Sequence, residues 1–252
     1  MATSNIRDSI LLIGASGRTG VCVLRYLCAA SVPVIAGVRR ADRLPSEPRL
    51  ASAEVAITNL EQPGAVAPLM DRAAHVIYLA GSERRSLSPG AWQLEVESLS
   101  LCLELGRRSG LPGRWAYVGY SDAERAGDVT WAESRWRELK REAEQVITSS
   151  SLNYFILRTG HITDPASDQP RVSVSQRSGA SLEAELPCNV LAFLLTGVAL
   201  AGAAPRSNAT VRVDPSGMKL QEAVQAFGRL RPDPAAQTAD GWDSSRVSFN
   251  RR

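Results

Sequence analysis

The chain has 252 residues, of which 44% are hydrophobic and 22% charged, and its formal net charge is +3. This composition is typical of a globular protein with a substantial core, and the weak positive charge argues against nucleic acid or a membrane surface as partner. No stretch approaches the roughly 18 apolar residues of a membrane span, and the polar N-terminus does not resemble a signal peptide. The four cysteines form no CxxC pair, so we expect buried thiols, no metal site and a cytoplasmic location.

Apolar runs of strand length alternate with amphipathic stretches of helical length along much of the chain. The expected strands are 9–13, 32–38, 53–58, 75–80, 114–118 and 153–157. The expected helices between them are 18–30, 63–72, 92–109 and 131–148. This alternation predicts right-handed crossovers and a doubly wound parallel sheet, which belongs to the α/β class.

The alternation becomes less regular after Gly160, where a polar stretch follows the sixth expected strand. The remaining expected elements are a helix over 187–201, a strand over 209–213 and a helix over 218–230. Residues 231–252 are rich in Pro, Asp, Ser and Ala, so we expect a mobile tail there.

The strongest motif is the segment from Gly14 to Gly20, GASGRTG, which directly follows an apolar strand and begins an amphipathic helix. In this context the glycine spacing is typical of a Rossmann-type dinucleotide-binding turn, although a purely structural glycine turn has the same composition. Gly14 allows a tight turn, Gly17 lets the backbone approach a pyrophosphate, and Gly20 allows close helix–strand packing. The helix N-terminus offers free N–H groups and a favourable dipole to the anion. The predicted phosphate-binding residues are Gly14, Ser16, Gly17, Arg18, Thr19 and Gly20.

The end of the second expected strand predicts which dinucleotide binds. An NAD-selective site usually carries an acid about 20 residues after the glycine turn, but this chain reads VRR there, with no carboxylate before Asp42. A carboxylate would repel a 2′-phosphate, whereas a guanidinium binds it through charge-assisted hydrogen bonds. We therefore predict NADP(H), with Arg39 and Arg40 at the 2′-phosphate and Arg18 as a further cation. The alternative is that Arg39 and Arg40 are solvated charges at a strand end.

Five segments of the chain match the pattern of one known family. They are the glycine loop, the VRR strand end, HVIYLAG over 75–81, RWAYVGYSDA over 114–123 and LNYFILRTGHITD over 152–164. Together they resemble the atypical short-chain dehydrogenase/reductases of the NmrA-like, NAD(P)H-binding group. The resemblance implies a single Rossmann domain over 1–230, with a small C-terminal part from about 160 to 230 that covers the substrate.

The resemblance also implies contacts along the cofactor. It places Asn59 and Leu60 beside the adenine, and Ala80 and Gly81 in the segment that passes under the cofactor. It further implies that Lys140 bonds the nicotinamide ribose.

The catalytic residues depart from the family pattern. Typical short-chain reductases use a Tyr-x-x-x-Lys pair, in which the lysine lowers the pKa of the tyrosine and the tyrosine transfers the proton. The matching stretch here is WRELK, so Lys140 is present, but Trp136 replaces the tyrosine. An indole N–H cannot act as a general acid in that way. Gly119 and Tyr120 occupy the positions where the family has serines, so the usual triad is not intact.

Tyr120 and His161 are the candidate proton donors, because they follow strands whose carboxyl ends should face the cofactor crevice. Either could instead be a packing or surface residue. The sequence therefore predicts an NADP(H)-dependent oxidoreductase, monomeric or homodimeric, that acts on a small carbonyl or enone metabolite. Two alternatives are a non-redox NADP-dependent isomerase, epimerase or cyclase, and a non-catalytic NADP(H)-sensing regulatory protein.

Overall fold

A computed structural model describes residues 8–81, 90–121, 130–166, 170–176, 185–201 and 206–231. Its strands are β1 (Ser9–Ile13), β2 (Val34–Val38), β3 (Glu54–Ile57), β4 (Ala73–Tyr78), β5 (Trp115–Tyr120), β6 (Tyr154–Thr159), β7 (Ile162–Thr163), β8 (Val172–Ser175), β9 (Leu186–Pro187) and β10 (Ser207–Val213). Its α-helices are α1 (Arg18–Ala29), α2 (Pro63–Met70), α3 (Ser98–Arg108), α4 (Trp131–Thr148), α5 (Cys188–Ala201) and α6 (Leu220–Phe227). Two 3-10 turns, η1 (Ala41–Arg43) and η2 (Pro48–Leu50), and a π-helical turn, η3 (Gln93–Glu97), complete the set.

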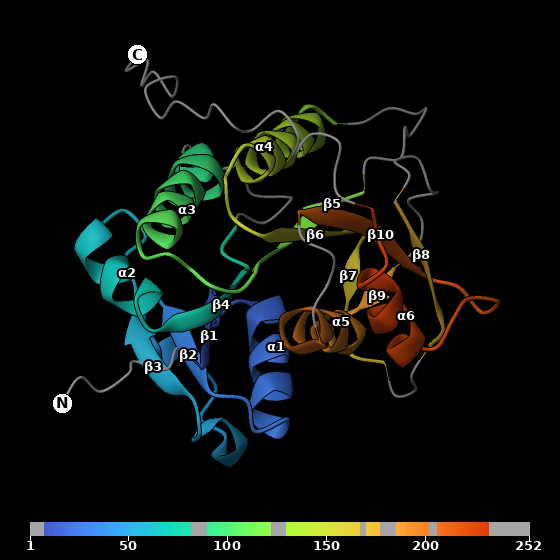
Figure 1. Ribbon diagram of the computed structural model, residues 1–252, viewed down its shortest axis with the longest axis horizontal. Helices are drawn as coiled ribbons and strands as arrows, with labels where there is room; N and C mark the ends of the chain where they lie inside the picture. Colours follow the sequence, from blue (N-terminus) through green and yellow to red (C-terminus); the bar gives the residue numbers. More distant parts are fainter. Residues whose placement is uncertain are drawn as a thin grey trace.

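Eight of the strands form one sheet in the order β3-β2-β1-β4-β5-β6-β10-β8 (Figure 1). All neighbours in it are parallel except β8, which pairs antiparallel with β10 at one edge. The order reverses at β1, which has β2 on one side and β4 on the other. Ligands of doubly wound sheets bind outside the carboxyl ends of the strands at such a reversal. The sheet confirms the predicted Rossmann-type α/β fold.

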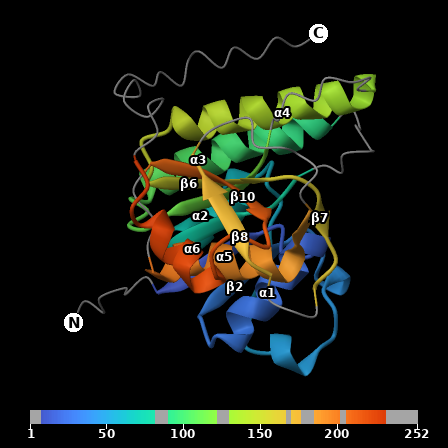
Figure 2. The same ribbon diagram turned by 90° about the vertical axis from the view of Figure 1, so that its right-hand side faces the viewer.

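Helices cover both faces of this sheet. In Figure 2, α3 and α4 lie above the sheet, and α1, α5 and α6 lie below it. Side chains of a strand alternate between the two faces of a sheet. In β1, Ile10 and Leu12 therefore pack on the side of α1, α5 and α6, whereas Leu11 and Ile13 pack on the side of α3 and α4. A strand covered on both faces must be apolar throughout, which explains the SILLI sequence of β1.

The C-terminal part of the chain extends this sheet. The expected strand over 209–213 is β10, which begins two residues earlier and pairs with β6. The antiparallel strand β8 was not expected, because the sequence VSVS is short and half polar. Of the predicted tail, all residues after Arg231 lie outside the described ranges. Within those ranges, no helix is both long enough and apolar enough to cross a membrane.

Candidate functional site

The glycine loop joins β1 to α1 at the reversal of the strand order. Gly14 has a φ of +85°, and a Cβ there would lie only 2.6 Å from the backbone nitrogen of Ala80. A Cβ at Gly20 would lie 2.1 Å from the carbonyl oxygen of Gly14. Both positions therefore require glycine, because the turn is pressed between the end of β4 and the first turn of α1.

Little of the protein surrounds the position that a side chain at Gly17 would occupy. Gly17 is exposed, and a Cβ there would meet only the carbonyl oxygen of Gly14, at 3.4 Å. As the N-cap of α1 it offers no side chain to the N–H groups of the first turn, which carries no acidic residue. Those N–H groups have no carbonyl partner inside the helix. Half-buried Ser16 and Thr19 flank this position. The loop thus fits an anion such as a pyrophosphate at the positive end of the helix dipole.

The three arginines that the sequence places near the cofactor differ in their partners. Arg40 forms an ion pair with Asp42, and its guanidinium lowers the pKa of that carboxyl. Arg18 donates a hydrogen bond of 2.8 Å to the carbonyl oxygen of Ile162, so it reaches the segment after β6. Arg39 is exposed at the end of β2 and has no partner among the described residues. Of the three, Arg39 has the guanidinium that a phosphate can bind without displacing another contact.

The two residues expected beside the adenine lie just after β3. Asn59 is exposed, and its Oδ1 accepts a hydrogen bond of 3.2 Å from the backbone N–H of Glu61. Leu60 is only 6% exposed and packs in the core on the α2 side of the sheet. A contact between Leu60 and adenine would therefore come from its backbone.

The end of β4 connects the glycine loop to Lys140. The backbone of Ala80 packs against Gly14, and the next residue is Gly81. A Cβ at Gly81 would lie 3.3 Å from Nζ of Lys140 and 2.9 Å from Oε1 of Glu95. Lys140 extends from α4, so this helix places an ammonium group directly beside the strand end that contacts the glycine turn.

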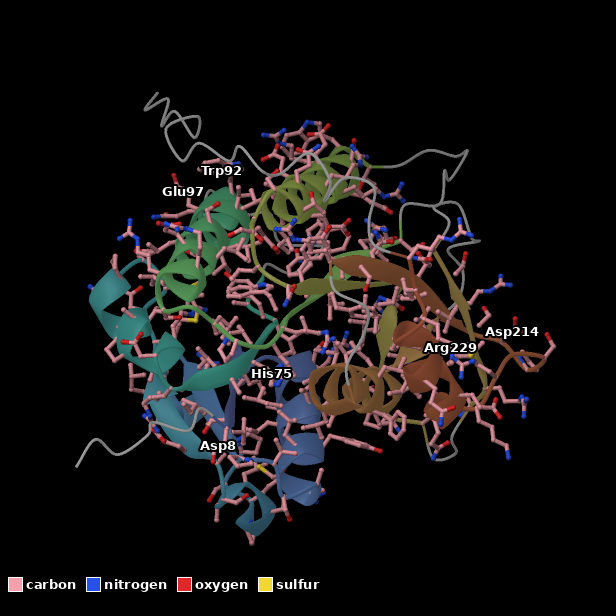
Figure 3. All side chains as sticks on the ribbon, viewed as in Figure 1. Asp8, His75, Trp92, Glu97, Asp214 and Arg229 are labelled. Carbon is pink, nitrogen blue, oxygen red and sulfur yellow. The ribbon has the colours of Figure 1, made fainter. Side chains whose placement is uncertain are left out.

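The partner of Lys140 is Glu95, a residue that no sequence motif singled out. Its side chain is fully buried, and its Oε2 accepts a hydrogen bond of 2.8 Å from Nζ of Lys140. Glu95 lies in η3, so the helix expected over 92–109 begins with a π-helical turn. Figure 3 shows Trp92 and Glu97 at the outer end of α3, away from the sheet. The available signal was the spacing: Glu95 lies four residues before the core residue Leu99 and so occupies a core position of that helix.

Trp136 lies between the candidate catalytic side chains. It is 8% exposed, and Nζ of Lys140 lies 5.6 Å from the centroid of its ring and 5.6 Å from that of Tyr117, within the range of a cation–π interaction. The half-buried ring of Tyr120 packs edge-on against the indole, with 4.8 Å between centroids. The structure therefore brings Lys140 and Tyr120 to the same tryptophan.

His161 lies apart from this group. Its side chain is exposed, and its carbonyl oxygen accepts a hydrogen bond of 2.8 Å from the backbone N–H of Leu186. In the described ranges, no contact joins its ring to Tyr120 or Lys140. The strand register nevertheless pairs Tyr120 with Thr159, so His161 follows β6 at the same edge of the sheet.

Comparison with known proteins agrees with this geometry. A protein structure from Bacillus halodurans, named for the NAD-dependent epimerase/dehydratase class, has a TM-score of 0.74 at 19% identity and covers 86% of this chain and 99% of its own. ChuY, an anaerobillin reductase from Escherichia coli O157:H7, has a TM-score of 0.65 at 19% identity, with 82% of this chain and 98% of its own covered. A short-chain dehydrogenase/reductase of the wide type from Veillonella parvula, in complex with NADP, has a TM-score of 0.61 at 15% identity, with 84% and 97% covered.

At these identities the solved structures show a shared fold. No curated protein matches the sequence significantly. A family model, however, matches residues 14–187, which is more than half of the chain and includes the glycine loop, the end of β4 and Lys140. The chain belongs to the NAD(P)H-binding family.

Proposed function

We propose that this protein is an NADP(H)-dependent oxidoreductase of the atypical short-chain dehydrogenase/reductase type, NmrA-like, that acts on a small carbonyl or enone metabolite. The observation that supports this most is the end of β4. There Ala80 contacts the glycine turn and the adjacent Gly81 faces the Lys140 ammonium. In a dinucleotide the pyrophosphate is joined directly to the nicotinamide ribose, so one ligand can contact both groups.

The preference for NADP(H) over NAD(H) rests on the end of β2. Arg39 offers an exposed guanidinium with no partner among the residues described, whereas Arg40 is neutralised by Asp42. A 2′-phosphate carries the negative charge that such a guanidinium binds. The NADP complex of the Veillonella parvula protein, which shares this fold, supports the same preference.

The chemistry follows from the groups at the carboxyl ends of β4, β5 and β6. NADPH, when bound, supplies a hydride. Reduction of a carbonyl then needs a proton at the oxygen, and we assign Tyr120 or His161 as its donor because both lie at this edge of the sheet. Lys140 would donate hydrogen bonds to the ribose hydroxyls and hold the nicotinamide in place. ChuY, a reductase with this fold, supports a redox reaction.

The part from about 160 to 230 is proposed to cover the substrate. Its first segment is tied to the glycine loop through the hydrogen bond between Arg18 and the carbonyl oxygen of Ile162. A substrate near the nicotinamide would then lie under this segment, away from bulk water.

The experiment has two stages, binding and turnover. Binding of NADPH and NADH to the purified protein is measured by titration calorimetry, with tighter binding of NADPH expected. Aldehydes, ketones, enones and quinones are then screened for loss of NADPH absorbance at about 340 nm, with the Gly17→Val variant as the inactive control because a side chain there occupies the space of the phosphate. Failure to bind either dinucleotide would refute the proposal. Binding without turnover of any class would refute the oxidoreductase part and leave the two alternatives, a non-redox NADP-dependent isomerase, epimerase or cyclase and a non-catalytic NADP(H) sensor.

A further inference from the structure

A buried ion pair links two helices at the proposed cofactor site. The Glu95 carboxylate is fully buried, and the Lys140 side chain is only 14% exposed. Their hydrogen bond of 2.8 Å joins η3 to α4 across 45 positions of the sequence. The pair lies beside Gly81, the residue after the one that contacts the glycine turn.

Stability alone is a weak explanation for this pair. Removing two charges from water is unfavourable, and apolar replacements of such pairs are often neutral or stabilising. The surroundings are otherwise suited to apolar side chains, since Leu99 and Leu139 nearby on the two helices are almost completely buried. A π-helical turn adds to the irregularity of the site, and such turns occur frequently where a helix carries a functional group.

The ammonium of Lys140 retains hydrogen-bonding capacity. It has three donors, and in the described part of the chain only Glu95 accepts a hydrogen bond from it. The rings of Tyr117 and Trp136 offer it only their π faces. Gly81 has no side chain that could cover the ammonium, although a Cβ at this position would lie only 3.3 Å from Nζ. The remaining donors can therefore serve a ligand at the end of β4.

We propose that Glu95 is a positioning residue of the cofactor site: its carboxylate holds the Lys140 ammonium beside Gly81, where the ammonium binds the hydroxyls of the nicotinamide ribose. This inference rests on the proposed binding of NADP(H). Glu95 acts through Lys140 and therefore on the nicotinamide half of the cofactor alone. Trp136, which replaces the tyrosine of the family pattern, contributes a π face to the same ammonium.

The test compares two ligands that differ in the nicotinamide half. NADPH contains the nicotinamide ribose, whereas adenosine 2′,5′-bisphosphate contains only the adenosine end of the cofactor. Titration calorimetry with both ligands is carried out on the full-length protein and on the variants Glu95→Gln, Lys140→Met and the double variant. Glutamine keeps the size and can still accept a hydrogen bond, and Glu95→Asp retains the charge as a second probe. Glu144→Gln is the matched control, because Glu144 is another poorly exposed carboxylate, on α4 itself, which pairs with Arg158 instead.

We expect Glu95→Gln to raise the Kd for NADPH about 10-fold, the lower end of the range for one hydrogen bond to a charged group, because the glutamine can still accept a hydrogen bond. Glu95→Asp should fall between Glu95→Gln and the wild type. The Kd for adenosine 2′,5′-bisphosphate should change little. The thermal midpoint should fall, because the variant leaves the poorly exposed Lys140 ammonium without its counter-charge, so the titrations are run well below that midpoint. In the Lys140→Met background, Glu95→Gln should have almost no further effect on NADPH, since the residue acts through the ammonium. Glu144→Gln should bind both ligands like the wild type.

Three results would overturn the inference. Wild-type affinity for NADPH in Glu95→Gln would show that the carboxylate is not needed. Equal losses for both ligands would indicate a general structural effect, and additive losses in the double variant would show that Glu95 does not act through Lys140. In all three cases the wild type binds NADPH, so the proposed binding of NADP(H), on which this inference rests, stands. If the wild type binds neither ligand, the proposed function fails and the inference fails with it.

Discussion

Replacement of Arg39 by alanine tests the proposed cofactor preference most directly. The side chain is exposed and has no partner in the part of the chain described, so the free energy of unfolding should change by less than about 0.5 kcal/mol. A hydrogen bond to a charged group is worth about 1.5–3 kcal/mol, and exposure to solvent favours the lower end of that range. Because about 1.4 kcal/mol corresponds to a factor of ten, the Kd for NADPH should rise about 10- to 30-fold.

NADH serves as the internal control, because it lacks the 2′-phosphate and its affinity should not change. The matched protein control is the double variant Arg40→Ala/Asp42→Ala, which removes the neighbouring ion pair without changing the net charge. Titration calorimetry at low and at high salt measures all of these affinities. The preference for NADPH should weaken with salt in the wild type and depend on salt less in Arg39→Ala, because salt screens exposed charges.

Two outcomes would refute this reasoning. Equal losses of NADPH and NADH affinity would mean that Arg39 supports the site in general rather than the 2′-phosphate. Unchanged NADPH affinity in Arg39→Ala, with a loss in the double variant, would assign the phosphate contact to Arg40. The second result would also show that the ion pair with Asp42 opens when the cofactor binds.

Three further predictions concern the loop, the proton donor and stability. Gly17→Val should abolish binding of both dinucleotides with little change in the thermal midpoint. Gly20→Ala should instead unfold the protein, because a Cβ there would lie 2.1 Å from the backbone carbonyl oxygen of Gly14, and circular dichroism measures this loss of structure. Tyr120→Phe or His161→Ala should lower kcat by about 10²- to 10⁴-fold without changing NADPH affinity; full turnover by both would exclude both as donors. Burial, and to a smaller extent the charge of Arg114, lower the pKa of His75. Below about pH 6.5 the imidazole is therefore protonated in the unfolded chain but still neutral in the folded chain. The free energy of unfolding, measured by urea denaturation, should therefore fall as the pH drops below about 6.5, and it should fall less in His75→Asn.

Features that depend on neighbouring residues could be predicted from the sequence. Period and composition predicted the alternating strands and helices, because a strand covered on both faces must be apolar and a helix with one covered face must be amphipathic. The glycine spacing predicted the turn between β1 and α1, where the backbone geometry at Gly14 and Gly20 excludes a side chain. The resemblance to a family pattern placed Lys140 at the cofactor, and the structure has its ammonium beside Gly81.

Contacts between distant parts of the chain were decided only by the tertiary structure. The sequence offered Arg39 and Arg40 together at the 2′-phosphate and Arg18 as a further cation, but folding directs Arg18 to Ile162, 144 positions away. The spacing to Leu99 could have placed Glu95 on the buried side of its helix, but only the packing of η3 against α4 brought it to Lys140. Periodicity reports which side of an element is buried, whereas the partner of a buried charge depends on how whole elements pack, and that information is not local in the sequence.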